Sequence, residues 1–505
     1  MNILLVYPQY PVTFWSFKYA LKFIAKKASL PPLGLLTVAA MLPREWDQRL
    51  VDLNTSKLTD ANIRWADFVL VSAMSIQKES ADEIILRCQQ LGRKVIAGGP
   101  HFTAHAKDYG HVDHLVLNEA EITLPLFLAD LAKGTQKHLY TSPLWADLGT
   151  TPLPRFDLMR MKHYASMNIQ YSRGCPFDCD FCNITVLYGR TPRTKSADQV
   201  VAELEALYLQ GWRHSVFIVD DNFIGNKGKL KRELLPAILA WMEKRNHPFK
   251  LFTEVSINLA DDSELMALMV CAGFDQVFVG IETPNEESLA ECNKHQNQNR
   301  DLIANVRKIQ HAGLEVQAGF IVGFDKDPTV IFEHLIAFIQ ESGIVTAMVG
   351  LLNAPAGTKL HRRMEQEGRI IKNDTGDNTD FSINFVSKMN NETLVNGYRQ
   401  ILGTIYAPKH YYARVRKFLQ EYQPPQKLQG RLKFMYVRAF VQSVVRLGIL
   451  GRERYQYWKL IAWSLVRKPR LLPLAITFSI YGFHFRQVLM RHEKKLRTTR
   501  AALGV

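Results

Sequence analysis

Short apolar runs alternate with helix-like stretches along the first 135 residues of the chain. Runs of this kind are expected of strands that are buried on both faces of a parallel sheet. The predicted strands are residues 2–7, 48–51, 68–72, 94–97 and 114–117, and the predicted helices are residues 33–42, 78–91 and 122–133. This alternation predicts an α/β, Rossmann-like doubly wound sheet, whose ligands lie at the carboxyl ends of the strands.

A second set of alternating strands and helices begins near residue 168 and continues to about residue 359. The predicted strands are residues 169–171, 216–219, 251–255, 276–281, 316–321 and 346–351. Six βα repeats predict a partial barrel whose chemistry lies on the loops that follow the strands.

The last part of the chain reads as mostly helical, with helices predicted at residues 390–402, 410–421, 431–447 and 456–466. The pattern therefore divides the chain into four parts. They are a Rossmann-like domain at residues 1–135, a connector at 136–165, a partial barrel at 166–362 and a basic, mostly helical domain at 363–505.

The charge of the chain is unevenly distributed. There are 63 Lys and Arg against 48 Asp and Glu among 505 residues, and most of the surplus follows Pro408. Aromatic residues alternate there with Arg and Lys, a composition suited to an anionic membrane surface. A basic helical cap packed on the barrel is an equally simple interpretation. Nucleic acid is not an expected partner, because no recognised RNA-binding module follows the barrel.

Residues 471–490 are apolar enough to raise the question of a membrane span. A span needs about 20 nearly uncharged residues, and Pro473, His484 and Arg486 interrupt this stretch. We therefore expect no spanning helix. With no signal peptide recognised, we expect a cytoplasmic protein whose membrane contact is at most peripheral, on the inner face.

Three of the six cysteines form the most informative motif of the chain. Cys175, Cys179 and Cys182 have the spacing C-x₃-C-x₂-C, which can hold three irons of a [4Fe–4S] cube and leave the fourth without a protein ligand. Zinc is the main alternative, but zinc sites usually add a second Cys or His pair, and no such pair follows here. The other cysteines are interpreted as buried thiols; they are Cys88, Cys271 and Cys292.

The cysteine spacing resembles the signature of the radical S-adenosylmethionine (SAM) superfamily, in which SAM chelates the open iron. The ends of the later predicted strands carry further matches. The resemblance implies SAM contacts at Asp220, Asp221, Asn222, Glu254, Glu282, Gly319 and Gly323. A helix cap is the alternative for the Asp220 motif, and a solvated strand end is the alternative for Glu254. Asp327 departs from the Pro-Gly-Glu usual in the family, which leaves its role open.

The N-terminal sheet carries loops that are similar to those of the cobalamin-binding domains that precede many radical SAM domains. These are the Pro31-Pro-Leu-Gly34 helix start, the Gly98-Gly-Pro-His101 loop and Glu119-Ala-Glu121. The resemblance implies cobalamin contacts at Pro32, Gly34, Ser72, Ser75, Gly98, Gly99, His101 and Glu119. The motif D-x-H-x-x-G is absent, which implies cobalamin without a protein His ligand. The nucleotide motif G-x-G-x-x-G is also absent, so NAD is disfavoured.

Two weaker signals, residues 7–16 and Tyr406–Tyr412, resemble the hopanoid C-2 methylase group, which has a C-terminal extension of uncharacterised role. This resemblance implies methylation of an unactivated carbon in a hydrophobic, hopanoid-type lipid. A 5′-deoxyadenosyl radical and methylcobalamin would carry the reaction, and flavodoxin or ferredoxin would donate electrons. Two alternatives stay open: a cobalamin-dependent enzyme without methyl transfer, such as a tetrapyrrole cyclase or a ring-rearranging enzyme, and a non-catalytic cobalamin or iron–sulfur sensor.

Overall fold

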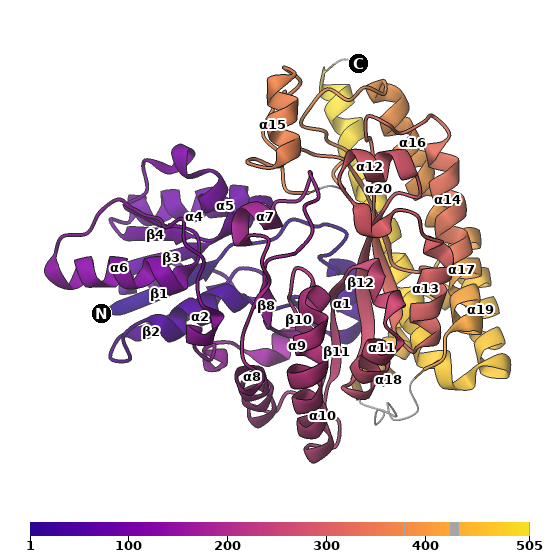
Figure 1. Cartoon of the computed structure of the whole chain (residues 1–505), viewed down its shortest axis with the longest axis horizontal. Coiled ribbons are helices and arrows are strands. Elements are labelled where there is room, and N and C mark those ends of the chain that lie inside the picture. The colour runs from indigo at the N-terminus through magenta and orange to yellow at the C-terminus, as the bar shows by residue number, and fades with distance from the viewer. Residues whose placement is uncertain (378, 425–433, 504–505) are drawn as a thin grey trace.

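Two parallel sheets of six strands each form the body of the protein (Figure 1). The structure is a computed structural model that describes residues 1–377, 379–424 and 434–503. The first sheet has the order β2-β1-β3-β4-β5-β6. Its strands are β1 (Asn2–Tyr7), β2 (Asp47–Asp52), β3 (Phe68–Ser72), β4 (Lys94–Gly98), β5 (His114–Val116) and β6 (Leu139–Tyr140). The strand order reverses between β1 and β3, where doubly wound sheets bind their ligands.

The first sheet has a separate hydrophobic core on each face, because side chains alternate along a strand. On β1, Leu4 and Val6 belong to one core, and Ile3 and Leu5 belong to the other. The five predicted strands of this sheet are confirmed, and β6 was not predicted. Helices cover both faces; they are α2 (Leu33–Met41), α3 (Asp60–Trp65), α4 (Lys78–Gln90), α5 (Pro100–Ala104) and α6 (Ala120–Lys133).

The second sheet forms the predicted partial barrel, in the order β14-β13-β12-β11-β10-β7. Its strands are β7 (Met167–Ile169), β10 (Ser215–Ile218), β11 (Lys250–Val255), β12 (Phe274–Glu282), β13 (Glu315–Val322) and β14 (Ala347–Leu351). The helices between them include α8 (Ala197–Leu209), α10 (Leu235–Lys244), α11 (Ser263–Cys271), α12 (Glu286–Glu291), α13 (Leu302–His311) and α14 (Ile331–Ser342). The first barrel strand ends two residues earlier than predicted, because Ser172–Arg173 (β8) instead pairs antiparallel with Arg193–Thr194 (β9).

The C-terminal region is helical, as predicted, and covers one side of the barrel (Figure 1). Its helices are α15 (Lys359–Gln366), α16 (Asn391–Ile405), α17 (Pro408–Glu421), α18 (Phe434–Ser443) with a π-helical continuation at Val444–Ile449, α19 (Arg454–Arg467) and α20 (Leu472–Leu503). The predicted start of the third helix, residues 431–433, lies outside the described residues. Within the described ranges, no helix is long and apolar enough to cross a membrane.

The long helix α20 was not predicted. Pro473 lies in its first turn, where a backbone N–H has no intrahelical partner and proline is tolerated. Burial lowers the pKa of His484 to about 4, so the ring is neutral when it bonds the Phe14 carbonyl at 2.9 Å. Arg486 pairs with Glu453 at 2.6 Å. The polar residues that interrupt the apolar stretch are therefore buried or paired inside the fold.

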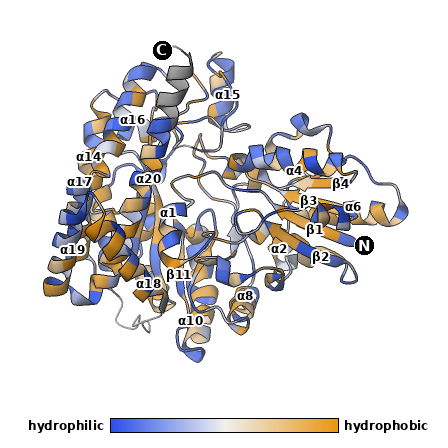
Figure 2. Ribbon diagram, turned by 180° about the vertical axis from the view of Figure 1, so that it is seen from behind, coloured by the Kyte–Doolittle hydropathy of each residue, from blue (hydrophilic) through white to orange (hydrophobic). Residues whose placement is uncertain are grey.

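Residues between β1 and α2 leave the first sheet and join the core of the barrel and the C-terminal helices. The Phe14 ring stacks on Phe485 of α20 at 4.2 Å, and Phe14 and Phe23 belong to the same core as the barrel strands. Helix α1 (Lys18–Leu21) lies against α20. Viewed from behind, hydrophobic residues fill the strands of the first sheet and recur along α18 and α19 (Figure 2).

Candidate functional site

The three cysteines of the motif lie on the loop between β8 and α7 (Ile184–Tyr188). Gly174 begins this loop with φ of 91°, and a Cβ there would lie 2.9 Å from the Thr191 carbonyl oxygen, so only glycine fits. Burial raises the pKa of all three thiols, that of Cys182 to about 12, and the charge of Cys179 raises the pKa of Cys175 and Cys182 further. The three thiols are thus close enough to interact.

Side-chain donors and a cation surround these thiols. Asn222 Nδ2 lies 4.0 Å from Cys175 Sγ, and Gln296 Nε2 lies 3.8 Å from Cys179 Sγ. The ammonium of Lys294 acts to lower the pKa of each thiol. Because thiols must lose their protons to ligate a metal, these groups favour the ligating form.

The two aspartates of the Asp220 motif have different positions. The Asp220 carboxylate accepts hydrogen bonds from the backbone of Tyr171 and Ser172, both at 2.8 Å, and does not line the cavity described below. It therefore holds the start of the cysteine loop. Asp221 accepts from Gly174 N–H at 3.0 Å and does line that cavity. Asn222 precedes a short 3₁₀ helix without making a side-chain cap, so the helix-cap alternative is wrong for this residue.

Two glutamates at the ends of barrel strands have different environments. Glu254 lines the cavity, and burial together with the charges of Asp221 and Asp220 raises its pKa to about 8. Glu254 is half-buried and faces the cavity, not the outer surface of the protein. Glu282 is buried at φ of 64° and pairs with Lys294 Nζ at 2.7 Å. Burial alone would lower the pKa of Lys294, but the charges of Glu282 and Cys179 outweigh it and raise that pKa.

The two glycines of β13 and its following loop serve local packing. A Cβ on Gly319 would lie 2.9 Å from the ring of Phe278. Gly323 has φ of 108° and donates its N–H to Asp327 at 2.8 Å. Asp327 also accepts from Ser288 Oγ at 2.7 Å, so its role is to close this loop. Neither glycine lines the cavity.

One cavity of about 1910 Å³ extends from the carboxyl ends of the first sheet into the barrel. It collects predicted residues from both sheets, namely Pro32, Gly34, Ser72, Gly98, Gly99, Glu119, Asp221 and Glu254. The remaining candidates lie off its walls, namely Ser75, His101, Asp220, Asn222, Glu282, Gly319, Gly323 and the three motif cysteines. The carboxyl ends of the two sheets therefore open into one shared space.

The glycines on the first-sheet side of the cavity differ in whether the protein leaves room for a larger side chain. A Cβ on Gly98 would lie 2.5 Å from the Val116 carbonyl oxygen, and one on Gly99, at φ of 90°, would lie 2.6 Å from Ser72 Oγ. The protein itself requires these two glycines. A Cβ on Gly34 would meet nothing within 4 Å, so the space beside Gly34 is open to a ligand.

His101 and Ser75 face protein rather than the cavity. His101 is 1% exposed, and its Nε2 lies 2.7 Å from the Tyr109 hydroxyl, which donates to Asp82. Burial lowers the pKa of His101 to about 4, so the ring is neutral. Ser75 packs against Gly376, where a Cβ would approach Ser75 Cβ to 3.0 Å.

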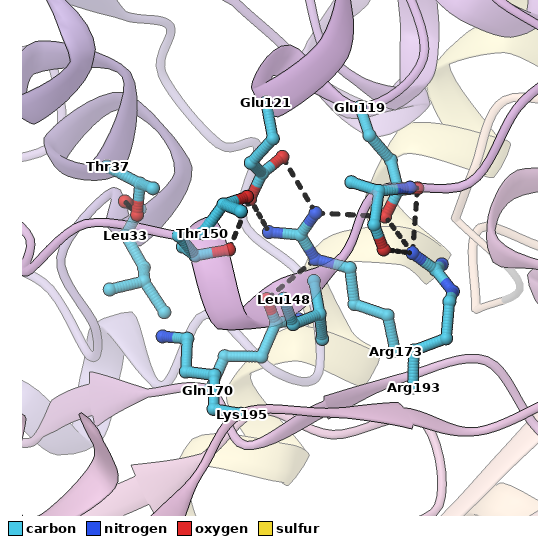
Figure 3. A network of polar contacts seen from close by, with 12 residues as sticks. Leu33, Thr37, Glu119, Glu121, Leu148, Thr150, Gln170, Arg173, Arg193 and Lys195 are labelled. Atoms are coloured by element: carbon cyan, nitrogen blue, oxygen red, sulfur yellow. Dashed lines mark hydrogen bonds and ion pairs between the residues drawn. The ribbon is translucent and has the colours of Figure 1, made fainter. Parts of the chain in front are cut away.

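Glu119 and Glu121, at the start of α6, are engaged in ion pairs with the strands that flank the cysteine loop (Figure 3). Arg173 of β8 binds Glu119 at 2.9 Å and Glu121 at 2.7 Å, and Arg193 of β9 binds Glu119 at 2.9 Å. The Glu119 carboxylate, predicted as a cobalamin contact, is thus occupied by two arginines. This network joins the first sheet to the cysteine loop.

Comparisons with known proteins agree with this division of the chain. The B12 binding domain family matches residues 25–128 and the Radical SAM superfamily matches residues 169–339. An uncharacterized methyltransferase of Synechocystis sp. is 40% identical over 96% of this chain and 92% of its own. The hopanoid C-2 methylase of Rhodopseudomonas palustris is 32% identical over 92% of this chain and 90% of its own. The chain belongs to the cobalamin-dependent radical SAM methyltransferases. The cofactors of this family are a [4Fe–4S] cluster, SAM and cobalamin.

Solved structures of cobalamin-dependent radical SAM proteins share the fold. The methyltransferase TsrM of Kitasatospora setae, with cobalamin and a [4Fe–4S] cluster bound, has a TM-score of 0.62 at 14% identity, covering 91% of this chain and 98% of that one. OxsB has a TM-score of 0.62 at 13% identity, covering 100% and 81%. The C-terminal region of this methyltransferase, residues 358–498, matches a family described only as a domain of unknown function (DUF4070).

The residues of this radical SAM methyltransferase fit its cofactors. Three interacting thiols with N–H donors and a lysine beside them suit a [4Fe–4S] cube, whose properties depend on hydrogen bonds to sulfur. Among the described residues, no group of three or more His, Cys, Asp or Glu could hold a single metal ion, whereas a cube spreads its ligands over separate irons. The open space at Gly34, beside the small residues of the first sheet, suits cobalamin.

Several residues that contact the motif cysteines or their loop had no sequence signal. Lys294 and Gln296 follow α12 without a motif, and Arg173 ends β8 without any indication that its partners are on α6. Among the other cysteines, Cys88 and Cys292 are buried as predicted, but Cys271 is exposed. It is the last residue of α11, where its side chain faces away from the core.

Proposed function

We propose that this enzyme methylates an unactivated carbon of a hydrophobic, hopanoid-type lipid. The observation that carries the proposal is the single cavity that joins the carboxyl ends of both sheets and continues along the inside of the barrel. The likeness to a hopanoid C-2 methylase over most of both chains supports this class of substrate.

The proposed roles of the residues follow from their positions. Cys175, Cys179 and Cys182 hold the cluster, and Asp221 and Glu254 bind the cationic part of SAM, whose positive charge would favour the ionised form of both carboxyl groups. Pro32, Gly34, Ser72, Gly98 and Gly99 form the surface that receives cobalamin. When bound, the reduced cluster and SAM supply the radical that abstracts hydrogen, and cobalamin supplies the methyl group.

Three of the remaining candidates act on the cysteine loop or its thiols rather than on a ligand. Asp220 positions the cysteine loop through Tyr171 and Ser172. Glu282 positions Lys294 beside the thiols. Asn222 donates toward Cys175.

The barrel interior provides an apolar environment for the body of the lipid. The Phe217 and Phe252 rings stack at 4.7 Å, and Trp15 meets Phe278 edge-on at 5.4 Å. All four side chains line the cavity. They exclude water from the path along which the substrate carbon reaches the cofactors, which protects a radical from side reactions.

We also propose a peripheral membrane contact on the outside of the C-terminal helices. Large apolar side chains are exposed along α18, its π-helical continuation and α19; they include Val441, Val445, Ile449, Leu450, Tyr455 and Val466. Arginines and lysines lie among them, as in surfaces that bind anionic lipids. Co-sedimentation with anionic vesicles but not with neutral ones supports this contact. Equal recovery in the supernatant with both kinds of vesicle contradicts it.

The test of the proposed function combines genetics and reconstitution. Lipids of cells with and without the gene are compared, and the purified enzyme, loaded with cluster and cobalamin, is then given the lipids of the deletion strain. Disappearance of one methylated lipid in the deletion strain, restored by the enzyme, supports the proposal. Formation of 5′-deoxyadenosine without any methylated lipid contradicts it and favours an enzyme that uses cobalamin without methyl transfer. In the reconstituted reaction, we expect that a protein electron donor such as flavodoxin or ferredoxin can reduce the cluster in place of a chemical reductant.

A further inference from the structure

A group of polar side chains lines the cavity at the end of the barrel opposite the cofactors. The group, called here the floor cluster, consists of Lys250, Asp275, Gln276, Glu315 and Gln317. Lys250 and Glu315 are the first residues of β11 and β13, whereas Asp221 and Glu254 lie near the carboxyl ends of the strands. None of the roles proposed above requires polar groups at this end.

The floor cluster is tied together by internal contacts. Lys250 Nζ pairs with Asp275 at 2.8 Å. Gln276 Nε2 donates to one Glu315 oxygen at 3.0 Å, and Gln317 Nε2 lies 3.3 Å from the other. Glu315 is 3% exposed and Asp275 is 9% exposed. Gln276 and Gln317 are half-buried and Lys250 is exposed. Burying the two acids costs free energy unless partners satisfy them.

The floor cluster still has hydrogen-bonding capacity to offer. In the described part of the chain, the side-chain carbonyl oxygens of Gln276 and Gln317 accept no hydrogen bond. Burial, with the charge of Asp275 added, raises the pKa of Glu315 to about 8, so at neutral pH its carboxyl carries a proton that it can donate. With Asp275 paired to Lys250, the cluster is close to neutral. A neutral group that both donates and accepts, such as a hydroxyl, matches it better than an ion does.

The inside face of β11 gives the spacing between the floor and the cofactor end. Because side chains alternate along a strand, Lys250, Phe252 and Glu254 share one face, and all three line the cavity. The face therefore runs from a cation through an aromatic ring to an acid. Four residues of strand span about 13 Å, which is the length of apolar wall between the two polar ends.

The C-terminal helices complete this end of the cavity. Tyr422, Tyr436 and Tyr481 line it. Burial, and then the charges of Glu315 and Asp275, raise the pKa of Tyr422 and Tyr481. The region of unknown function thus contributes walls to the same space as the floor cluster.

We propose that the floor cluster binds a hydroxylated end group of an elongated amphiphilic substrate, whose apolar body lies along the aromatic wall with its other end at the cofactors. This inference rests on the proposed function, because it uses the same cavity. It adds a requirement that the methylase proposal lacks, namely a polar, uncharged group far from the methylated carbon.

Equilibrium binding to the cofactor-loaded enzyme tests this inference without any turnover. The probes are a radiolabelled pentacyclic triterpene hydrocarbon, the same skeleton with a polyhydroxylated side chain, and the same skeleton with an amine-terminated side chain. We expect the hydroxylated probe to bind about tenfold more tightly than the hydrocarbon, as two net hydrogen bonds would give. Gln317→Leu and Glu315→Gln should each reduce this preference and leave hydrocarbon affinity unchanged, whereas Glu365→Gln, at an exposed position on α15, should change nothing.

Four results would overturn the inference. Three come from the wild-type enzyme: equal affinity for the hydrocarbon and the hydroxylated probe, tighter binding of the amine, and failure to bind any of the probes. The fourth is retention of the full preference in both variants. Failure of the methylase proposal would be seen in a different experiment. A product without the methyl label of SAM would contradict methyl transfer, whereas binding of the probes would be unaffected.

Discussion

The two sheets of this enzyme have the same plan but present opposite chemistry to the cavity that they share. Both have six parallel strands, and both direct their carboxyl ends to one space. The first sheet presents small uncharged residues there, such as Gly34, Ser72 and Gly99, and the two acids of its α6 are paired with arginines. The barrel presents Asp221 and Glu254, which form no ion pair in the described part of the chain. In the proposed function, the bulky cobalamin lies where the side chains are small, and the cationic SAM lies beside the acidic side chains.

The sheets also differ in how their cores are built. The first sheet is closed by its own helices on two separate faces. The barrel instead shares one core with residues 14–24 and with the C-terminal helices. The region of unknown function is therefore part of the barrel's packing. Within the described residues, the ion pairs that tie the first sheet's α6 to the strands beside the cysteine loop are those of the network of Glu119, Glu121, Arg173 and Arg193.

Removal of one cluster thiol should have the largest effect, because it should abolish the chemistry of the barrel and leave the cobalamin binding of the first sheet intact. Cys179→Ala leaves two thiolates, which cannot retain the site-differentiated cube, so 5′-deoxyadenosine formation should fall below detection. Cobalamin binding by the first sheet should be unchanged. Cys271→Ala, at an exposed thiol, is the matched control and should keep full activity. SAM cleavage by the Cys179 variant at the wild-type rate would refute the assignment of the cluster.

Loss of the ion pairs between α6 of the first sheet and the strands beside the cysteine loop should have the next largest effect. Arg173→Leu leaves the nearly inaccessible Glu119 paired only with Arg193 and removes the arginine partner of Glu121, which is equally inaccessible. Breaking a buried pair costs about 3–5 kcal/mol, which denaturant unfolding would measure. Arg155→Leu removes an exposed pair with Asp157 and should cost below about 1 kcal/mol. Equal costs for the two variants would mean that the network does not hold the halves together.

A bulky side chain on the first sheet's side should affect cobalamin alone. Gly34→Leu meets open space, so the apo protein should unfold at the same temperature or slightly higher, because leucine favours a helix. Cobalamin affinity should fall by about tenfold or more, equivalent to about 1.4 kcal/mol. Gly403→Leu, also helical and open, is the control. Unchanged cobalamin affinity in the Gly34 variant would show that cobalamin does not bind at this surface.

The acidic side of the cavity should show a pH dependence that the first sheet lacks. The pKa of Glu254 is raised from 4.5 to about 8, so its contribution to apo stability is fully present below pH 4.5 and is lost as the pH rises through about 8. Glu254→Gln should therefore be more stable than wild type at pH 9, by about 1 kcal/mol, and not at pH 4. The free energy of unfolding of both proteins is measured from pH 4 to pH 9. The same pH dependence in wild type and variant would contradict the raised pKa of Glu254.

The sequence predicted the strands and the cysteine motif well, because their signals are local. Buried parallel strands read as apolar runs, and cysteine spacing is set within one loop. Helix α20 was missed because His484 and Arg486 are satisfied only by Phe14 and Glu453, distant partners that the sequence does not connect to them.

The same limit applies to the site. The prediction that Glu119 contacts cobalamin came from its resemblance to cobalamin-binding domains, and no pattern in the sequence indicates that its carboxylate also pairs with Arg173 and Arg193. Lys294 joins the thiols only when α12 packs beside the cysteine loop. The floor cluster is a product of barrel closure, since its members come from three strands.

The most direct measurement follows the methyl group of SAM. Reconstituted enzyme with cobalamin and a reductant is given methyl-labelled SAM and the lipids of the deletion strain, without oxygen. We predict that one lipid acquires the label while 5′-deoxyadenosine and S-adenosylhomocysteine both form. Formation of 5′-deoxyadenosine together with a changed but unlabelled lipid would contradict methyl transfer in this cavity.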